Sequence, residues 1–373
     1  MSYGFQIFFF CLACFWPELG AESNLRMVNQ WAEMEFVFPD EETKQIAMTK
    51  QHYVPGKSIP IDVDVQYRKD SLSPRIFVTT TRFSEGRPVT LGTVDEKGKI
   101  SGYPDYSWHE NQGQNCEGIT SVYRTAVVDV TPGDCGDTYV YVADVAAYAL
   151  VVVDVARNRS WRLTHRLFYP FPTRAKVTVD GESFDLMDGV LGMALSPWRR
   201  NPDRFLYFHA FASTTENVVR TSVLKNDSFL ADPNVDPKLI RVFPDERPNQ
   251  AVAEAMDRKG IMYFGLMDPP SIWCWNSATE YNQRNFHQVA EDRETLQFAS
   301  GVKVINNLKR KQELWVLTSS FQRVMTESLS SNRTNFRIHA GKIPVILAKS
   351  PCLFPPKNRR HDYYANIIGA PAE

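Results

Sequence analysis

Short runs of apolar, β-branched and aromatic residues recur along the chain and are separated by clusters of Gly, Pro, Asp and Ser. Such runs, bounded by turn residues, are typical of β-strands. Helical periodicity is scarce: residues 24–36 fit a helix, although Trp31–Phe38 also alternates like a strand. The pattern predicts an all-β protein, with strands at Ile76–Thr80, Ala126–Val130, Tyr139–Val142, Leu150–Val155, Phe205–Phe208, Ile261–Leu266, Leu314–Leu317 and Ile343–Leu347.

The most apolar strand of each group marks a unit that repeats along the sequence. These strands contain Phe77, Tyr139, Val190, Met262 and Leu314, spaced by about 50–70 residues, the length of four short strands with their turns. About 350 residues of mature chain hold about six such units. No low-complexity linker divides them. We therefore expect one domain over residues 22–373, a six-bladed β-propeller of four-stranded blades.

The N-terminus predicts export from the cell. Residues Phe5–Trp16 are almost wholly apolar but too few to span a membrane, which takes roughly 20 residues. The small residues Gly20 and Ala21 and then polar residues follow, as at a signal-peptide cleavage site. We expect residues 1–21 to be a signal peptide and the mature protein to be secreted and extracellular. The alternative is a buried N-terminal strand.

The charge balance argues against two kinds of partner. The 373 residues contain 42 Lys and Arg against 43 Asp and Glu, and no run of five like charges occurs. Proteins that bind nucleic acid or anionic membranes carry a clustered basic excess, which this chain lacks. We expect no nucleic-acid partner, no membrane partner, and a monomer.

Cysteine usage agrees with export. Two of the six cysteines fall in the predicted signal peptide, and the even number that remains predicts two disulfides with three possible pairings. None of the four has C-x-x-C spacing or a nearby histidine, so we expect no zinc site. Three N-x-Ser/Thr sequons predict glycosylation and add support for export. The four cysteines are Cys116, Cys135, Cys274 and Cys352, and the sequons begin at Asn158, Asn226 and Asn332.

Common catalytic motifs are missing from the sequence. It contains no G-x-S-x-G, P-loop, G-x-G-x-x-G or H-E-x-x-H pattern, and its seven histidines are scattered singly. The paired acids at 62–64 and 185–188 lack the Gly and the distal Glu of a calcium loop. We therefore expect neither a metal nor a cofactor.

A series of motifs runs in order from about Val28 to Cys352. It includes CEGITSVYR at Cys116–Arg124, YFHAFASTTENVVRTSVL at Tyr207–Leu224 and LWVLTSSFQ at Leu314–Gln322. In order and spacing these motifs resemble the insect yellow / major royal jelly protein family, in particular its yellow-like, dopachrome-conversion-related branch. The resemblance implies a six-bladed propeller over about residues 28–352 with a short C-terminal tail. It also implies the pairings Cys116–Cys135 and Cys274–Cys352.

The resemblance implies several functions, because members of the family differ. Some resemble enzymes that convert dopachrome, others are pigment-patterning or nutrient proteins, and salivary members bind biogenic amines. The leading hypothesis is a secreted protein of melanin or cuticle pigmentation that binds a catechol- or indole-derived molecule, with dopachrome isomerisation as its chemistry. The alternatives are a non-catalytic binder of serotonin or catecholamines, and a structural secreted glycoprotein.

The family's amine binders suggest which residues would contact a ligand in the propeller channel. A hydroxyl or amide would hydrogen-bond the ligand's polar groups, while an aromatic ring would stack on the ligand's ring. By resemblance the corresponding residues are Thr318, Ser319, Phe321, Asn335 and Phe336. The alternative is that the two phenylalanines belong to the core and that Asn335 bridges strands.

Isomerisation of dopachrome would need a general base, and a His or a buried carboxylate would serve. No triad-like spacing singles one out. The candidates within the family-like motifs are His209, Glu216, Asp188 and Glu117, each of which could equally form structural hydrogen bonds.

Non-reducing peptide mapping of the secreted protein tests the disulfide prediction. We expect a Cys116–Cys135 peptide, a Cys274–Cys352 peptide and no free thiol, with the N-terminus near residue 21. A Cys135–Cys274 peptide would refute the pairing. A secreted chain that still starts at Met1 would contradict the signal peptide.

Overall fold

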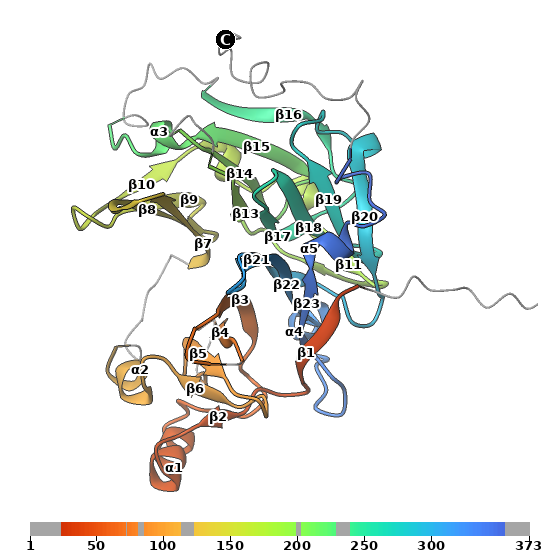
Figure 1. Cartoon of the computed structure of the whole chain (residues 1–373). Coiled ribbons are helices and arrows are strands. Elements are labelled where there is room, and N and C mark those ends of the chain that lie inside the picture. The colour runs from red at the N-terminus through yellow and green to blue at the C-terminus, as the bar shows by residue number, and fades with distance from the viewer. Residues whose placement is uncertain are drawn as a thin grey trace, which may run out of the picture.

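The computed structural model describes residues 24–71, 73–80, 86–112, 123–198, 203–228 and 239–354. Twisted antiparallel sheets are set around a common centre (Figure 1). The first strands of the blades, β3, β7, β13, β17 and β21, form an inner ring in which neighbours contact each other. The prediction of an all-β propeller is confirmed.

Five blades are found among the described residues. Blade 1 has a short parallel fifth strand, β2, and blade 5 is completed by β1. Their strands are as follows: blade 1, β3 (Pro60–Gln66), β4 (Arg75–Thr80), β5 (Leu91–Val94), β6 (Ile100–Gly102) and β2 (Phe36–Val37); blade 2, β7 (Tyr123–Thr131), β8 (Asp134–Asp144), β9 (Ala149–Asp154) and β10 (Arg159–Thr164); blade 3, β13 (Val190–Leu195), β14 (Phe205–Ala210), β15 (Thr215–Arg220) and β16 (Ile240–Glu246); blade 4, β17 (Ala251–Met256), β18 (Ile261–Met267), β19 (Pro270–Asn276) and β20 (Phe286–Glu291); blade 5, β21 (Ala299–Asn306), β22 (Gln312–Ser319), β23 (Phe336–Lys342) and β1 (Arg26–Trp31).

The remaining elements lie outside the blades. They use residues that the estimate of about six repeats had counted as part of blades. A separate two-stranded hairpin connects blades 2 and 3. A sixth blade is not found in the described ranges, although the sequence length predicted about six. These elements are the hairpin β11 (Lys176–Val179) and β12 (Glu182–Asp185), and the helices α1 (Glu41–Thr49), α2 (Tyr106–Gln112), α3 (Thr221–Leu224), α4 (Phe321–Met325) and α5 (Ile343–Ile346).

Two local predictions are settled by the structure. The segment that fitted a helix or a strand forms the strand β1. The strand predicted at Ile343–Leu347 is wrong, because these residues form the short helix α5 and its C-terminal cap. Pro344 explains the difference: proline cannot donate to a strand ladder but is tolerated in the first turn of a helix.

Apolar side chains fill the junctions between successive blades. Tyr141 and Phe208 belong to the cluster between blades 2 and 3, and Tyr207 and Trp275 to the cluster between blades 3 and 4. Similar clusters join blade 4 to blade 5 and blade 5 to blade 1. No cluster joins blade 1 to blade 2 in the described part of the chain.

A disulfide links Cys274 on β19 to Cys352, with a Cα–Cα distance of 6.4 Å. It fixes the segment after α5 against blade 4, where both sulfurs are buried. Cys116 lies outside the described residues, so its pairing with the exposed Cys135 stays a prediction.

Replacing Cys274 and Cys352 together by Ala should lower the free energy of unfolding by about 4 kcal/mol, because the bond closes a loop of 78 residues. Urea unfolding in oxidising buffer measures this loss. In reductant the wild type and the variant should unfold at similar urea concentrations. Equal midpoints in oxidising buffer would show that the crosslink adds nothing.

Candidate functional site

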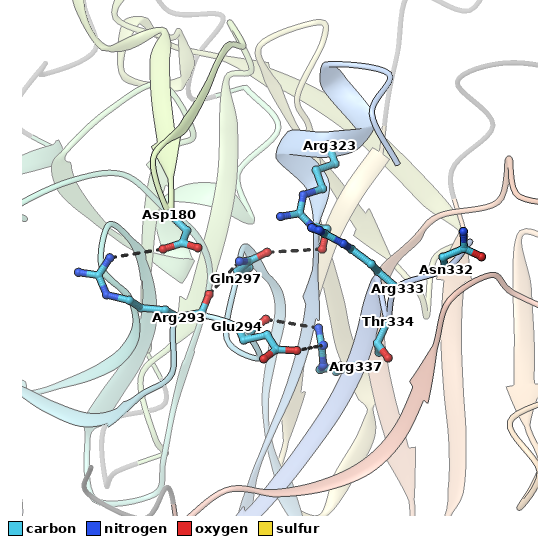
Figure 2. A pocket seen from close by; sticks show the side chains of 10 residues that line it. Asp180, Arg293, Glu294, Gln297, Arg323, Asn332, Arg333, Thr334 and Arg337 are labelled. Carbon is cyan, nitrogen blue, oxygen red and sulfur yellow. Dashed lines mark hydrogen bonds and ion pairs between the residues drawn. The ribbon is translucent and has the colours of Figure 1, made fainter. Parts of the chain in front are cut away.

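A pocket of about 540 Å³ lies where four connecting segments meet (Figure 2). One side comes from the connection between β20 and β21, the opposite side from α4 and the residues before β23, and the rim from the β11–β12 turn. The lining residues are Asp180, Arg293, Glu294, Gln297, Ser320, Arg323, Asn332, Arg333, Thr334 and Arg337.

Arginine dominates the charge of this pocket. Four lining arginines face only two lining carboxylates. Arg293 lies 3.3 Å from Asp180, and the buried Arg337 lies 3.3 Å from the exposed Glu294. Figure 2 shows both pairs. The pocket therefore has an excess of positive charge.

The other two arginines differ in their partners. Arg323 donates from Nε and Nη2 to Glu182 on β12, at 3.0 Å each. Arg333 is exposed, and its guanidinium has no ion-pair partner among the described residues. The Nε atom of buried Arg337 also lacks a hydrogen-bond partner there. Because the Arg337 Nε atom is buried, Arg333 is the arginine that an anionic ligand would reach from the pocket.

The predicted ligand residues lie in the wall beside this pocket rather than on its surface. All five are buried, at 1–3% exposure. Phe321 stacks on Phe298 at 4.3 Å and Phe336 belongs to the cluster between blades 5 and 1. Thr318 donates to the Thr295 carbonyl at 2.7 Å. Ligand contact by these residues stays a prediction.

Asn335 positions the loop that precedes β23. Its Nδ2 donates to the carbonyls of Ala32 and Ser330, at 2.8 Å each. Its backbone N–H donates to the Trp31 carbonyl at 2.8 Å. These bonds hold the loop that presents Asn332, Arg333 and Thr334 to the pocket.

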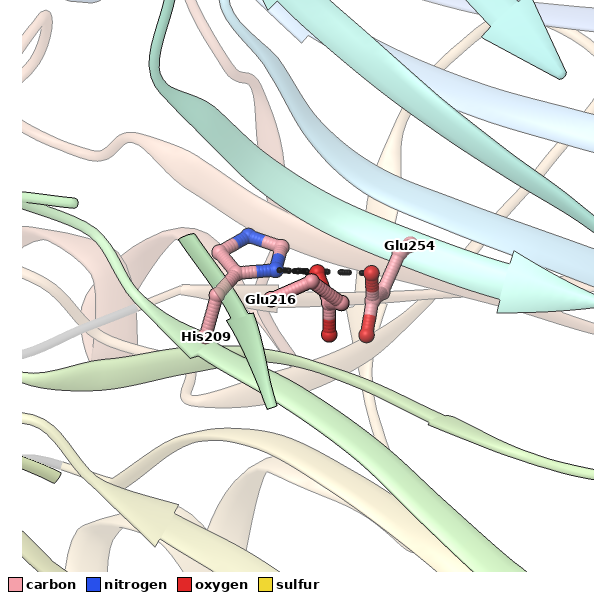
Figure 3. A group of neighbouring side chains, drawn as sticks. All are labelled: His209, Glu216 and Glu254. Carbon is pink, nitrogen blue, oxygen red and sulfur yellow. Dashed lines mark hydrogen bonds and ion pairs between the residues drawn. The ribbon is translucent and has the colours of Figure 1, made fainter. Parts of the chain in front are cut away.

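Two of the predicted catalytic candidates meet in a buried network (Figure 3). His209 on β14 lies 3.0 Å from Glu216 on β15 and 3.4 Å from Glu254 on β17, measured from Nδ1 to carboxylate oxygens. The guanidinium of Arg247 contacts Glu216 and also donates to the Tyr281 hydroxyl at 3.0 Å. The side chains of His209, Glu216 and Glu254 are fully buried.

Packing brings the imidazole into this position. Gly192 on β13 lies against the ring, and a Cβ at this glycine would come within 2.1 Å of the His209 Cε1 atom. The other ring nitrogen, Nε2, lies 3.1 Å from the Ala251 carbonyl. Both ring nitrogens therefore face acceptors, which favours the doubly protonated imidazolium.

The network balances its own charge. Burial and Arg247 lower the pKa of His209, but the carboxylates of Glu254 and Glu216 outweigh them and raise it above its ordinary value. Burial, with help from Glu216, raises the pKa of Glu254. His209, Glu216 and Glu254 are the only described residues whose acidic and imidazole groups cluster closely enough to hold a metal. A protonated His209 and Arg247 offset the negative charge of these carboxylates, while both Glu254 oxygens and Glu216 Oε1 have no hydrogen-bond partner in the described part of the chain.

The other two candidates are not part of this network. Asp188 precedes β13 and lies 3.7 Å from Arg124 on β7. Burial raises the pKa of Asp188, although Arg124 opposes the shift. Glu117 lies outside the described residues.

The three predicted glycosylation sites are exposed. Asn158 lies in the turn between β9 and β10, and Asn226 follows α3. Asn332 lines the pocket, so a glycan there would narrow its opening. Glycosylation itself stays a prediction.

The sequence analysis missed Glu254, Arg247 and the pocket arginines. Glu254 is a charged residue within the apolar strand AVAEAM, which was a visible sign of a buried partner. Arg333 and Arg337 flank the predicted Asn335 but were not selected, because the amine-binding hypothesis favoured neutral and aromatic groups.

The chain belongs to the major royal jelly protein family, whose model matches residues 113–352. Major royal jelly protein 9 of Apis mellifera is 29% identical over 407 aligned positions, covering 90% of this chain and 92% of the relative. The dopaminechrome tautomerase of Drosophila melanogaster is 26% identical, covering 91% and 86%. Protein yellow of Drosophila melanogaster is 27% identical, covering 89% and 71%. In the described part of the chain, no helix is long and apolar enough to cross a membrane.

The raised pKa of His209 predicts how stability depends on pH. The protonated imidazole adds stability that is present in full below its ordinary pKa of about 6.5 and is lost as the pH rises through the folded value. Urea unfolding of the wild type from pH 6 upward should therefore show a falling free energy of unfolding, and His209→Gln should remove that part of the slope.

His339 provides a matched control, because burial lowers its pKa to about 4. Its contribution is lost as the pH falls below about 6.5, so His339→Gln should leave the decline at higher pH unchanged. An unchanged slope in His209→Gln would show that His209 is neutral in the fold.

Proposed function

We propose that this protein is secreted, binds a catechol- or indole-derived molecule bearing a carboxylate, and acts in melanin or cuticle pigmentation. The arginine-rich pocket of Figure 2 carries the proposal. It adjoins the segment that the family resemblance selects for ligand binding. Family membership and relatives named protein yellow and dopaminechrome tautomerase support an aromatic small-molecule ligand, whereas the carboxylate is inferred from the pocket's arginines, since dopaminechrome carries no carboxylate.

The size of the pocket fits such a ligand. Small-molecule sites usually have volumes of about 300–1,000 Å³, and this pocket has about 540 Å³. A bicyclic indole or aminochrome with one side group fits within that volume. The polar lining would hydrogen-bond catechol oxygens through Ser320, Thr334 and Gln297.

The charge favours a carboxylate over an amine. An arginine fork binds a carboxylate through two parallel hydrogen bonds, whereas an ammonium group would be repelled by the arginine excess. Dopachrome carries a carboxylate, while serotonin and dopamine carry only an amine. The pocket thus supports dopachrome or a related acid more strongly than the amine-binding alternative.

Isomerisation is the chemistry we propose for that ligand. A base must take a proton from a ring carbon, and only Asp180 and Glu294 among the lining residues carry carboxylates. The buried network of His209 lies outside this pocket, so we assign it a structural role. Binding is therefore better supported than turnover.

Calorimetric titration with indole-2-carboxylate, serotonin and dopamine tests the binding proposal. We expect indole-2-carboxylate to bind, and Arg333→Gln to weaken it by roughly 10- to 150-fold, the value of one lost charged hydrogen bond of about 1.5–3 kcal/mol. The matched control is Arg284→Gln, which changes an exposed arginine outside the pocket and should leave affinity unchanged.

Binding of serotonin or dopamine in preference to the acid would support the amine-binding alternative. If no probe binds at millimolar concentration, both binding hypotheses fail, and the structural glycoprotein is the hypothesis that remains. The rate of dopachrome loss, with and without Glu294→Gln, then decides whether bound ligand is isomerised.

A further inference from the structure

Among the described residues, blade 2 packs against an apolar neighbour on one face only. Tyr141, Leu150 and Val152 lie on the face that packs against blade 3. The opposite face presents two cross-strand rows of small apolar residues, which we call the valine face. Its members are partly or fully exposed and belong to none of the apolar clusters in the described chain. They are Ala126, Val128, Val140, Val142, Val151 and Val153.

This one-sided burial sets blade 2 apart from the blades with neighbours on both sides. All seven residues of β18 in blade 4 are buried, and so are all six of β13 in blade 3. Strands buried on both faces lose the alternation of apolar and polar residues. Valine on an exposed sheet face therefore marks a surface from which a neighbour is missing.

Blade 1 shows the matching feature across the gap. Phe77, Thr79 and Leu91 are only partly buried on its face toward blade 2. A cavity of about 660 Å³ is lined by these residues, by β7 and by the inner strands of the other blades. The inner strands β3 and β7 make only sparse contact, whereas the other inner neighbours pack closely. Blades 1 and 2 are also drawn apart in Figure 1.

The alignment with major royal jelly protein 9 covers 407 positions, although 90% of this chain is only about 336 residues. About 70 aligned positions of the relative thus have no counterpart here. That number matches the length of one four-stranded blade, about 50–70 residues.

We propose that this chain lacks one blade, between β6 and β7, and that a second copy of the chain covers the exposed valine face. The two valine faces meet about a twofold axis, so each copy supplies to the other the sheet packing that the absent blade would have supplied. Face-to-face sheets pack about 10 Å apart with interlocking β-branched side chains.

Charge selects self-pairing on this face. Both valine rows are uncharged across β7, β8 and β9, so identical faces meet without repulsion. The row formed by Ala126, Val142 and Val151 continues on β10 with Arg162. The charge of Arg162 is neutralised by its ion pair with Asp144. On the facing surface of blade 1, Asp62 is paired with Lys303 at 2.7 Å, but Asp64 is exposed, and two copies of that surface would bring these Asp64 carboxylates together. The valine face is therefore the better homodimer surface.

Sedimentation equilibrium of the full secreted chain tests the proposal. We expect a reversible dimer whose dissociation constant rises at least tenfold in Val128→Lys, since a twofold axis brings the two lysines to the same interface. Val128 is 54% exposed, so the fold itself should tolerate the change. The matched control is Val242→Lys on β16, at 45% exposure, which should leave the dimer intact.

If the lysine variant does not fold, Val128→Thr replaces it in the test, because threonine keeps the shape of the side chain. Val128→Thr should also weaken the dimer. A monomer at every concentration, as the sequence analysis expected, overturns the proposal. A dimer weakened equally by Val128→Lys and Val242→Lys, or by neither, overturns it as well.

Discussion

The antiparallel pairing of β1 with β23 joins the N-terminal strand to blade 5 and fixes most of what surrounds the candidate pocket. Trp31, near the start of the described chain, pairs with Phe336, more than 300 residues later. Without this pairing β23 would be an exposed edge of blade 5. The same pairing brings Trp31 close to blade 1, where its indole N–H donates to the Gly98 carbonyl at 2.6 Å.

The pairing also determines how the pocket is built. The residues that follow β1 accept hydrogen bonds from Asn335, and the same amide holds Ser330. The loop bearing Arg333 is thus fastened both to the residue after β1 and to its own Ser330. The opposite wall comes from the connection before β21, where Arg337 of β23 reaches Glu294. A ligand bound there would contact segments that are far apart in the sequence and that the packing of blade 5 brings together.

The propeller architecture could be predicted from the sequence because strand alternation and the spacing of strands are local properties. His209 and Glu216 were also found, since they lie in one family-like motif and β14 and β15 form a hairpin that brings them together. Glu254 and Arg247 come from the neighbouring blade and the connection before it. Their meeting with His209 depends on how blades pack, which no local pattern encodes.

The pocket shows a different limit of sequence reasoning. Thr318 and Phe336 lie on strands, and a strand residue in a packed blade is buried by its neighbours on both faces. The groups that reach solvent, such as Arg333 and Arg323, lie on connections and on a short helix. The residues selected from the sequence therefore lie in the buried wall of this pocket rather than on its surface.

The buried wall of the pocket and its exposed surface are formed by different parts of the fold. The strands and their inter-blade clusters keep the ring intact, while the connections carry the charges that a ligand would meet. A change such as a neutral residue at Arg333 would alter the pocket's charge without touching a blade. The charge of this pocket is thus set by residues of the connections and of a short helix rather than by the blades that form the fold.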